Sequence, residues 1–339
     1  MIKGVPLENM VIAQVGVENF GAYRRRCLRE AGCFRLAAVC DRDPAALARA
    51  AAAEDAAPYA DYAEMLEHPG LEGVVVSTGA DSHAALALAA LRRGLHVFIE
   101  KPLCCSRAEV EELRGAQRES GLVVGVGHNA CDHDPLLRLA KRYIDDGLLG
   151  TLCAVEDNTS HSGGLEIKPG DWRGLAGRNP GGMLFQCGCH ALHALRYLCG
   201  PVAAVAAMMR HDAHPDTSTA DAANVLLRFA SGVVGTLSCY HVTGYCHELR
   251  LFGTRGNLYI DTHNGTAHFQ ARRRNEAEPR APVEIPPREA AQRYAGLVSW
   301  RDAVRGGPPA RPGLEDGAAA VLTIFAADES ARAGRLVEL

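Results

Sequence analysis

Two patterns of apolar positions divide the chain near residue 130. In the first part, short runs rich in Val, Ile and Ala alternate with stretches whose apolar residues recur at helical spacing, as in a buried parallel sheet with crossover helices. The predicted strands are Met10–Val15, Phe34–Cys40, Gly73–Ser77, His96–Ile99 and Leu122–Val126, and the predicted helices are Gly21–Ala31, Pro44–Ala53, Ser82–Arg93 and Arg107–Glu119. This alternation predicts an α/β domain with a doubly wound parallel sheet of the Rossmann type over residues 1–128.

From residue 129 onward the pattern is that of an α+β domain. Asp134-Pro135 supplies an N-cap and a first-turn proline for a helix over Leu136–Asp145. Runs of alternating polarity then predict strands at Thr151–Glu156, Val202–Met208, Ala223–Phe229, Val233–Tyr240, His247–Phe252 and Asn257–Asp261. We therefore expect residues 129–339 to form a second domain on an open, mostly antiparallel sheet. A surface loop is expected over 274–288, and two late helices, Glu289–Val304 and Leu314–Ala333, could pack back on the first domain.

Composition narrows the class of protein. The chain has 339 residues, a formal net charge of −4 and 47% hydrophobic residues, which suits two globular domains and argues against nucleic acid or an anionic membrane as the main partner. No apolar run reaches the roughly 18 residues of a membrane-spanning helix, and the first nine residues lack the apolar stretch of a secretory signal. The twelve cysteines are too sparse for a disulfide scaffold, so we expect buried thiols and a cytoplasmic protein.

A glycine-rich turn follows the first predicted strand. Gly16 and Gly21 bracket this turn, and Asp41 ends the second strand twenty residues later, which is the arrangement of a dinucleotide-binding motif. Asp41 would take the adenosine ribose hydroxyls and favours NAD, whereas the adjacent Arg42 leaves NADP open. Glu18 stands where a second glycine normally admits the pyrophosphate. Its side chain must either turn outward or face two negative charges.

A lysine occupies a second informative position. Only four lysines occur in the chain, and one of them, Lys101, follows the strand His96–Ile99 in the sequence Glu100-Lys101-Pro102. The carboxyl end of a parallel strand lies at the edge where such sheets bind ligands. Partial desolvation and nearby cations can bring the pKa of a lysine into the range useful for proton transfer.

Together these motifs resemble the glucose–fructose oxidoreductase / inositol dehydrogenase (Gfo/Idh/MocA) family. The resemblance rests on the first glycine-rich turn, Asp81-Ser-His83, Glu100-Lys101-Pro102 and the segment from Gly181 to His190. It extends over nearly the whole chain through Asp145–Thr151, Val225–Gly235, Phe252–Gly256 and Asp328–Gly334.

The resemblance implies an NAD(P)-dependent oxidoreductase that acts on a secondary alcohol of a sugar, cyclitol or nucleotide sugar. It implies a second domain that binds substrate and forms homodimers or homotetramers. Lys101 would be the catalytic lysine, with a cis Lys101–Pro102 bond, and His190 the acid/base on the substrate side. The implied cofactor-binding residues are Gly16, Glu18, Asn19, Phe20, Gly21, Asp41, Arg42, Ser77, Thr78, His83, Glu100 and Lys101. The implied substrate-binding residues are Lys101, Asn129, His161, Arg173, Gln186 and His190.

Departures from the family pattern accompany these matches. Gln186 replaces an aspartate that many members carry, and Asn129-Ala130-Cys131 lacks an arginine often found there. The spacing of Gln186 and His190 places both on one face of a predicted helix. Arg173, in a loop expected over 157–180, could hold the cofactor carboxamide or an anionic substrate group. Three weaker candidates for the substrate site are His161, Lys168 and Tyr294.

The sequence is also compatible with two alternative functions and contains one group of possible metal ligands. Cys187, Cys189, His190 and His193 are metal-ligand types in close spacing, but Cys189 and His190 would point about 100° apart on a helix, so no metal is expected. A relative of this kind could also cleave a glycosidic bond through transient oxidation by bound NAD. A third hypothesis is a non-catalytic sensor that binds sugar or dinucleotide. The departures from the family pattern at Glu18 and Gln186 favour this hypothesis, whereas the presence of Lys101 and His190 argues against it.

Overall fold

The structure is a computed structural model that describes residues 9–214, 218–273, 278–287 and 289–339. The chain forms two compact units. The first comprises residues 1–130 and 290–318, and the second comprises residues 131–289 and 319–339. Part of the expected surface loop, at 274–277 and 288, lies outside the described residues.

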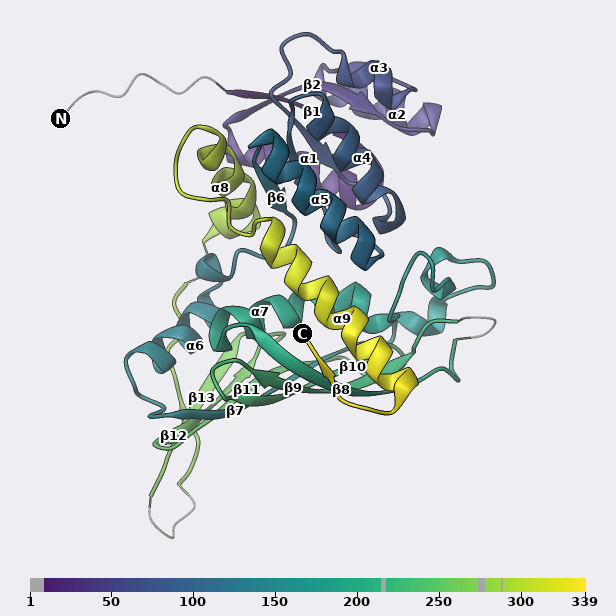
Figure 1. The fold of residues 1–339 in the computed structure, drawn as a ribbon. Coiled ribbons are helices and arrows are strands. Elements are labelled where there is room, and N and C mark those ends of the chain that lie inside the picture. Colours follow the sequence, from purple (N-terminus) through teal and green to yellow (C-terminus); the bar gives the residue numbers. More distant parts are fainter. Residues whose placement is uncertain (1–8, 215–217, 274–277, 288) are drawn as a thin grey trace, which may run out of the picture. The chain divides into compact units, whose positions relative to one another are not determined.

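The first unit contains the predicted doubly wound sheet (Figure 1). Its strands are β1 (Met10–Val15), β2 (Phe34–Cys40), β3 (Ala57–Tyr59), β4 (Gly73–Val76), β5 (His96–Ile99) and β6 (Val124–Val126). Its helices in the same stretch are α1 (Phe20–Ala31), α2 (Pro44–Glu54), α3 (Tyr62–Leu66), α4 (Ala80–Arg92) and α5 (Arg107–Ser120). The strand order β3-β2-β1-β4-β5-β6 is parallel throughout, which confirms the Rossmann prediction.

Two elements of this unit were not predicted. Strand β3 has three residues and includes Pro58, which cannot donate a hydrogen bond to a sheet and is tolerated because β3 is an edge strand. Helix α3 has only five residues and begins after the N-cap Asp61, whose side chain accepts a hydrogen bond from Glu64 N–H. Both elements are too short to show a periodic apolar pattern.

A late segment of the chain completes the core of the first unit. Helix α8 (Ala295–Val304) places the fully buried Trp300 against Met10 and Phe98. A Cβ at Gly73 or Gly125 would lie 2.9–3.0 Å from the Trp300 side chain, so the two glycines make room for the indole.

The helix predicted over 289–304 is shorter than expected, because a 3₁₀ turn (Ala290–Arg293) precedes α8.

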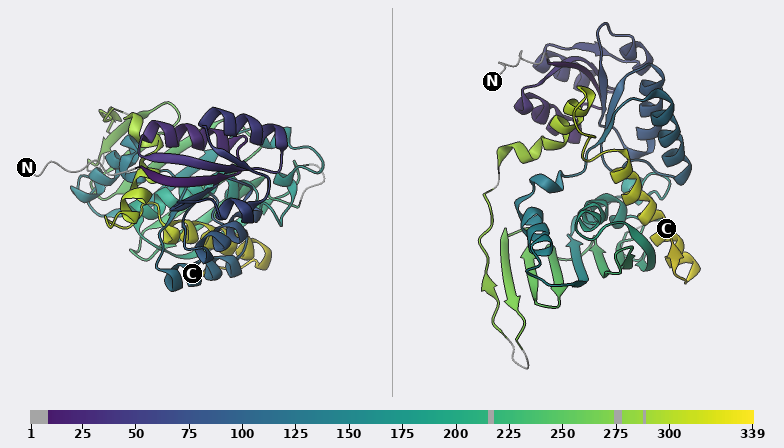
Figure 2. Two further views of the ribbon diagram at one scale, coloured as in Figure 1. Left: turned by 90° about the horizontal axis from the view of Figure 1, so that it is seen from above. Right: turned by 60° about the vertical axis from the view of Figure 1, so that its left-hand side comes forward.

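The second unit is built on a nine-stranded sheet (Figures 1 and 2). Its strands are β7 (Leu152–Ser160), β8 (Val202–Arg210), β9 (Ala222–Phe229), β10 (Val234–Tyr240), β11 (Cys246–Gly253), β12 (Gly256–Asp261), β13 (Thr266–Ala271), β14 (Ala281–Pro282) and β15 (Val337–Glu338). Its α-helices are α6 (Pro135–Asp145), α7 (Cys189–Cys199) and most of α9 (Leu314–Ala333). Among the strand pairs of the described residues in this sheet, only β7–β10 is parallel, so the prediction of an open, mostly antiparallel sheet is confirmed.

Several boundaries in this sheet differ from the predictions. Strand β7 continues to Ser160, so the first residues of the loop expected over 157–180 are strand instead. The alternation of Asp157, Asn158 and Thr159 is polar on both faces, which concealed this extension. Strands β13, β14 and β15 were missed, and β14 lies inside the expected surface loop. They are edge or near-edge strands, where little apolar burial marks the sequence.

No described helix is long and apolar enough to cross a membrane.

Candidate functional site

The glycine-rich turn between β1 and α1 is held tightly against the end of β4. Gly16 has a φ of +82°, and a Cβ there would lie 2.7 Å from the carbonyl carbon and oxygen of Ser77. At Gly21 a Cβ would lie 2.2 Å from the Gly16 carbonyl oxygen. Only glycine fits at either position, because real Cβ contacts are never so short. The turn therefore brings β1, α1 and Ser77–Thr78 together.

Asp41 fastens the same turn from the end of β2. Its Oδ2 accepts a hydrogen bond from Val17 N–H at 2.8 Å, and its Oδ1 accepts one from Asp43 N–H at 3.0 Å. On the other side of the turn, Arg25 Nη1 donates to the Val17 carbonyl at 2.5 Å. Each carboxylate oxygen of Asp41 keeps acceptor capacity for a further donor, as a ribose hydroxyl would require.

The N-terminus of α1 suits a phosphate group. The N-cap Asn19 has a φ of +50° and makes no side-chain capping hydrogen bond, and no acidic residue lies in the first turn. Orphan N–H groups at such a terminus are the usual ligands of a pyrophosphate. Glu18 turns outward, where Arg49 Nη2 of α2 lies 2.9 Å from its Oε1. The residues present thus fit a dinucleotide.

His83 ties the ends of β4 and β5 together. The imidazole is buried, with Nδ1 2.9 Å from the Pro102 carbonyl and Nε2 3.0 Å from the Thr78 carbonyl. Burial lowers the pKa of His83, although both carbonyls favour an N–H at the ring. The contact with the Pro102 carbonyl links His83 to the turn that carries Lys101, and the cofactor contact implied by the resemblance stays a prediction. The Lys101–Pro102 bond is cis, as the resemblance implied.

A buried ion pair lies directly before this turn. Arg24 of α1 contacts the Glu100 carboxylate through Nε, and both side chains are almost fully buried. The Arg24 guanidinium also lies over the Phe98 ring at 5.1 Å. The second carboxylate oxygen of Glu100, Oε2, is buried without a hydrogen-bond partner among the described residues. A donor on a bound ligand would satisfy it.

The remaining residues predicted for the cofactor site lie along the same edge of the sheet. Thr78 and Lys101 follow β4 and β5 and are half-buried, and Asn129, which was predicted for the substrate site, follows β6 and is exposed. Arg42 follows β2 and is exposed, and Phe20 opens α1 with an exposed fraction of 46%. These residues thus follow the carboxyl ends of the parallel strands.

In the second unit, His161 and the segment before α7 form a second cluster. The predicted regular helix through Gln186 is wrong, because Leu184–Gly188 is a π-helical turn and α7 begins at Cys189. Such turns are frequent at functional sites. His161 Nε2 lies 3.4 Å from Cys187 Sγ, while His161 Nδ1 accepts a hydrogen bond from Gly163 N–H at 3.0 Å. The Nδ1 contact places the proton of the neutral ring on Nε2, which donates to the sulfur.

Further histidine side chains of the second unit belong to this cluster. The ring of His241 packs edge-on against those of His161 and His214, each with a centroid distance of 5.1 Å. Tyr245 stacks on His247 at 4.5 Å and lies 6.5 Å from His161. Burial, with smaller contributions from His161, His214 and Arg173, lowers the pKa of His241 to about 4. The cluster is therefore held in the neutral state at physiological pH.

Arg173 borders this cluster from a 3₁₀ turn (Trp172–Gly174). Its guanidinium lies over the Trp172 ring at 4.7 Å and 3.4 Å from an Asp171 carboxylate oxygen. The Arg173 carbonyl accepts hydrogen bonds from Asn179 and Thr219, which fix the backbone of the turn. The guanidinium is partly exposed and can bind an anionic group.

The structure also shows the surroundings of the other two weaker candidates. Tyr294 packs against the core around Trp300 in the first unit, and Lys168 is exposed.

Asp157 is a titratable residue of this region that the sequence did not reveal. It shares a face of β7 with Thr159 and His161, and Thr159 Oγ1 donates to its Oδ1 at 2.8 Å. Burial raises the pKa of Asp157 to about 6. The run from Asp157 to His161 is polar at every position, so no alternation marks Asp157 in the sequence. His214 and His241 were missed because they are far apart in sequence.

Among the described residues, no group of three or more His, Cys, Asp or Glu side chains could hold a metal ion.

The comparisons with known proteins agree with this geometry. Residues 10–128 match the profile described as "Oxidoreductase family, NAD-binding Rossmann fold", and residues 137–259 match the GFO/IDH/MocA C-terminal domain. The scyllo-inositol 2-dehydrogenase (NAD(+)) of Bacillus subtilis is 27% identical over 60% of this chain and 58% of its own length. The dTDP-3,4-didehydro-2,6-dideoxy-alpha-D-glucose 3-reductase of Streptomyces antibioticus is 31% identical over 67% of each chain. The structure of an aldose-aldose oxidoreductase from Caulobacter crescentus matches with a TM-score of 0.85 and 26% identity, covering 98% of this chain and 100% of that one.

Fold and site together define an NAD-binding oxidoreductase with a Rossmann domain. The chain belongs to the Gfo/Idh/MocA family.

The lowered pKa of His241 predicts a loss of stability in acid. The folded state favours the neutral ring, so stability is fully present above the ordinary histidine pKa of 6.5 and falls as the pH drops toward about 4. The loss amounts to about 3 kcal/mol at most. His241→Gln should flatten the pH dependence of urea unfolding between pH 6.5 and 4, whereas the exposed control His133→Gln should not. An unchanged pH dependence in His241→Gln would contradict the assignment.

Proposed function

We propose that the protein transfers a hydride between NAD and a secondary alcohol of a sugar, cyclitol or nucleotide sugar. The observation that carries this proposal is the convergence of the Gly16–Gly21 turn, Asp41 and Lys101 on the carboxyl edge of one parallel sheet. Relatives with 27% and 31% identity are named as an inositol dehydrogenase and a nucleotide-sugar reductase. These names support the substrate class.

In this proposal the first unit binds the cofactor, and the second unit binds the substrate. Asp41 accepts the ribose hydroxyls, the N-terminus of α1 faces the pyrophosphate, and Glu100 Oε2 offers an acceptor near Lys101. NAD, when bound, supplies the carbon that accepts or gives the hydride. Of the residues predicted for cofactor contact, Glu18 and His83 act indirectly, because their side chains are engaged by Arg49 and by main-chain carbonyls.

Lys101 is proposed to bind the reacting hydroxyl and to hold or release its proton. The His83 contact with the Pro102 carbonyl holds the backbone next to Lys101. His190 is proposed as the acid/base of the second unit, at the first turn of α7 directly after the π-helical turn. Arg173, Gln186, His161 and Asn129 are proposed to recognise hydroxyl or anionic groups of the substrate. His161 has both ring nitrogens engaged, so it would contribute mainly its ring face.

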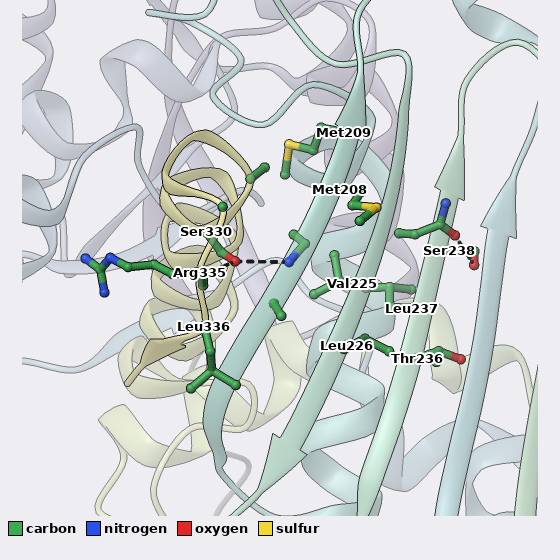
Figure 3. A pocket seen from close by; sticks show the side chains of 15 residues that line it. Met208, Met209, Val225, Leu226, Thr236, Leu237, Ser238, Ser330, Arg335 and Leu336 are labelled. Carbon is green, nitrogen blue, oxygen red and sulfur yellow. Dashed lines mark hydrogen bonds between the residues drawn. The ribbon is translucent and has the colours of Figure 1, made fainter.

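We further propose that the protein is a homo-oligomer assembled through the outer face of the nine-stranded sheet. Met208, Leu226 and Val234 are 82%, 60% and 54% exposed, and their strand pairing places them on one face. A hollow of about 800 Å³ lies between these strands and the chain near Arg335 and Leu336 (Figure 3). Large apolar side chains this exposed on neighbouring strands favour a protein interface. Cysteines buried within apolar elements, such as Cys27 and Cys239, support a cytoplasmic location.

Lys101→Ala should lower turnover at least about 100-fold, the usual effect of removing an acid/base group. The measurement is NADH formation with a panel of sugars and cyclitols, together with calorimetric titration of NAD. NAD affinity and the unfolding midpoint should stay close to those of the wild type. The control is Lys141→Ala, since Lys141 only pairs with Asp145 on the surface of α6. Near wild-type turnover in Lys101→Ala would rule out the assigned role.

Leu226→Glu should lower the mass measured by light scattering at micromolar concentration from that of a dimer or tetramer to that of a smaller species. The reason is that burying an unpaired carboxylate in an interface is unfavourable. Leu165→Glu is the control, because Leu165 is 66% exposed in a different part of the unit. A wild-type monomer, or an unchanged mass in Leu226→Glu, would contradict this proposal.

A further inference from the structure

Glu18 occupies an unusual place in the dinucleotide-binding turn. It lies between two residues that are fixed by the turn itself, since Val17 is held by Asp41 and Arg25 and Asn19 adopts a φ of +50°. The backbone therefore directs the Glu18 side chain away from the N-terminus of α1 and toward α2. There Arg49 Nη2 meets Glu18 Oε1 at 2.9 Å. Both side chains are about half exposed, so each is accessible to a ligand.

The pair lies at the adenosine end of the proposed cofactor site. The Asp41 carboxylate bonds to Val17 N–H, one residue from Glu18, and to Asp43 N–H, at the N-cap of α2. The N–H groups of Ala46 and Ala45 lower the pKa of Asp43, and Arg49 makes a smaller contribution. Arg49 thus lies within electrostatic reach of the segment that begins at Asp41.

Two further arginines lie near this segment: Arg42 follows Asp41 and is exposed, whereas Arg25 is already engaged. Its Nη1 donates to the Val17 carbonyl, and its Nε lies 3.5 Å from a Glu54 carboxylate oxygen. In doubly wound folds, the acid at the end of the second strand receives the ribose hydroxyls, and a nearby arginine accommodates a 2′-phosphate when NADP is the cofactor. An arginine fork is suited to phosphate, but in an arginine paired with a carboxylate the charge is partly offset and one donor is occupied.

We propose that Glu18 is a specificity-determining residue for the cofactor: by pairing with Arg49, it withholds that guanidinium from a 2′-phosphate and keeps the site selective for NAD. The inference rests on the proposed placement of the adenosine ribose at Asp41. The glycine that normally occupies this position of the motif could not do this. Glu18 therefore takes part in recognition at the ribose, and its charge does not confront the pyrophosphate.

The test is calorimetric titration of NAD and NADP against the wild type, Glu18→Gln, Arg49→Gln and the double variant. Glu18→Gln should bind NADP about fivefold more tightly, the size of one partly exposed charge contact, and should bind NAD within twofold of the wild type. The gain should disappear in the Arg49→Gln background, because it acts through the released guanidinium. It should also shrink as the salt concentration rises.

Glu67→Gln is the matched control, since Glu67 pairs with Arg93 on another exposed part of the same unit. It should leave both affinities unchanged.

The proposal is overturned if Glu18→Gln leaves NADP affinity unchanged, or if the gain is the same with and without Arg49. A salt-sensitive gain in NAD affinity of the same size would also overturn it, because it would mean that Glu18 opposes the pyrophosphate. If the proposed cofactor site itself were wrong, the wild type would bind neither NAD nor NADP, and this result is distinct from those above.

Discussion

The contact between the Gly16 backbone and the Ser77 carbonyl is the constraint on which the proposed cofactor site depends. It joins the first β–α turn to the end of β4, and neither Gly16 nor Gly21 has room for a Cβ. Asp41 and Arg25 then fasten the turn through the N–H and C=O of Val17. Because these interactions use the backbone, the side chains at positions 18 and 20 are not needed to hold the turn. Glu18 can therefore replace the usual glycine without closing the site to a dinucleotide.

The two units differ in the charge of their buried titratable side chains. In the first unit, Arg24 and Glu100 form an ion pair beneath the turn that carries Lys101, and removal of one partner would leave an uncompensated buried charge. In the second unit, the titratable side chains near Cys187 are mainly neutral imidazoles in ring contact, with Asp157 on the neighbouring strand face. Neutral groups of this kind can exchange hydrogen bonds with the hydroxyls of an uncharged polyol at little electrostatic cost. This difference matches a charged cofactor on one unit and a sugar-like ligand on the other.

Much of the fold could be predicted from the sequence, because buried parallel strands such as β1, β2 and β5 are short apolar runs with clear boundaries. The missed strands, β3 and β13 to β15, lie at or near sheet edges, where burial leaves a weak pattern. Cofactor-site candidates could be named because they lie in local motifs at strand ends. The partners Arg49 of Glu18, Arg24 of Glu100 and His241 of His161 could not be named, since tertiary folding brings them together across long stretches of sequence.

The most direct test of the account is the calorimetric affinity for NAD of Gly16→Ala against that of Gly32→Ala. Both glycines have positive φ, but a Cβ at Gly16 would strike the Ser77 backbone, whereas a Cβ at Gly32 would meet nothing within 4 Å. Both variants therefore carry the same left-handed strain of about 1 kcal/mol, and only one displaces the turn. We expect Gly32→Ala to bind NAD like the wild type and Gly16→Ala to bind it at least about tenfold more weakly, a difference of about 1.4 kcal/mol. Equal NAD affinities in the two variants would contradict the account.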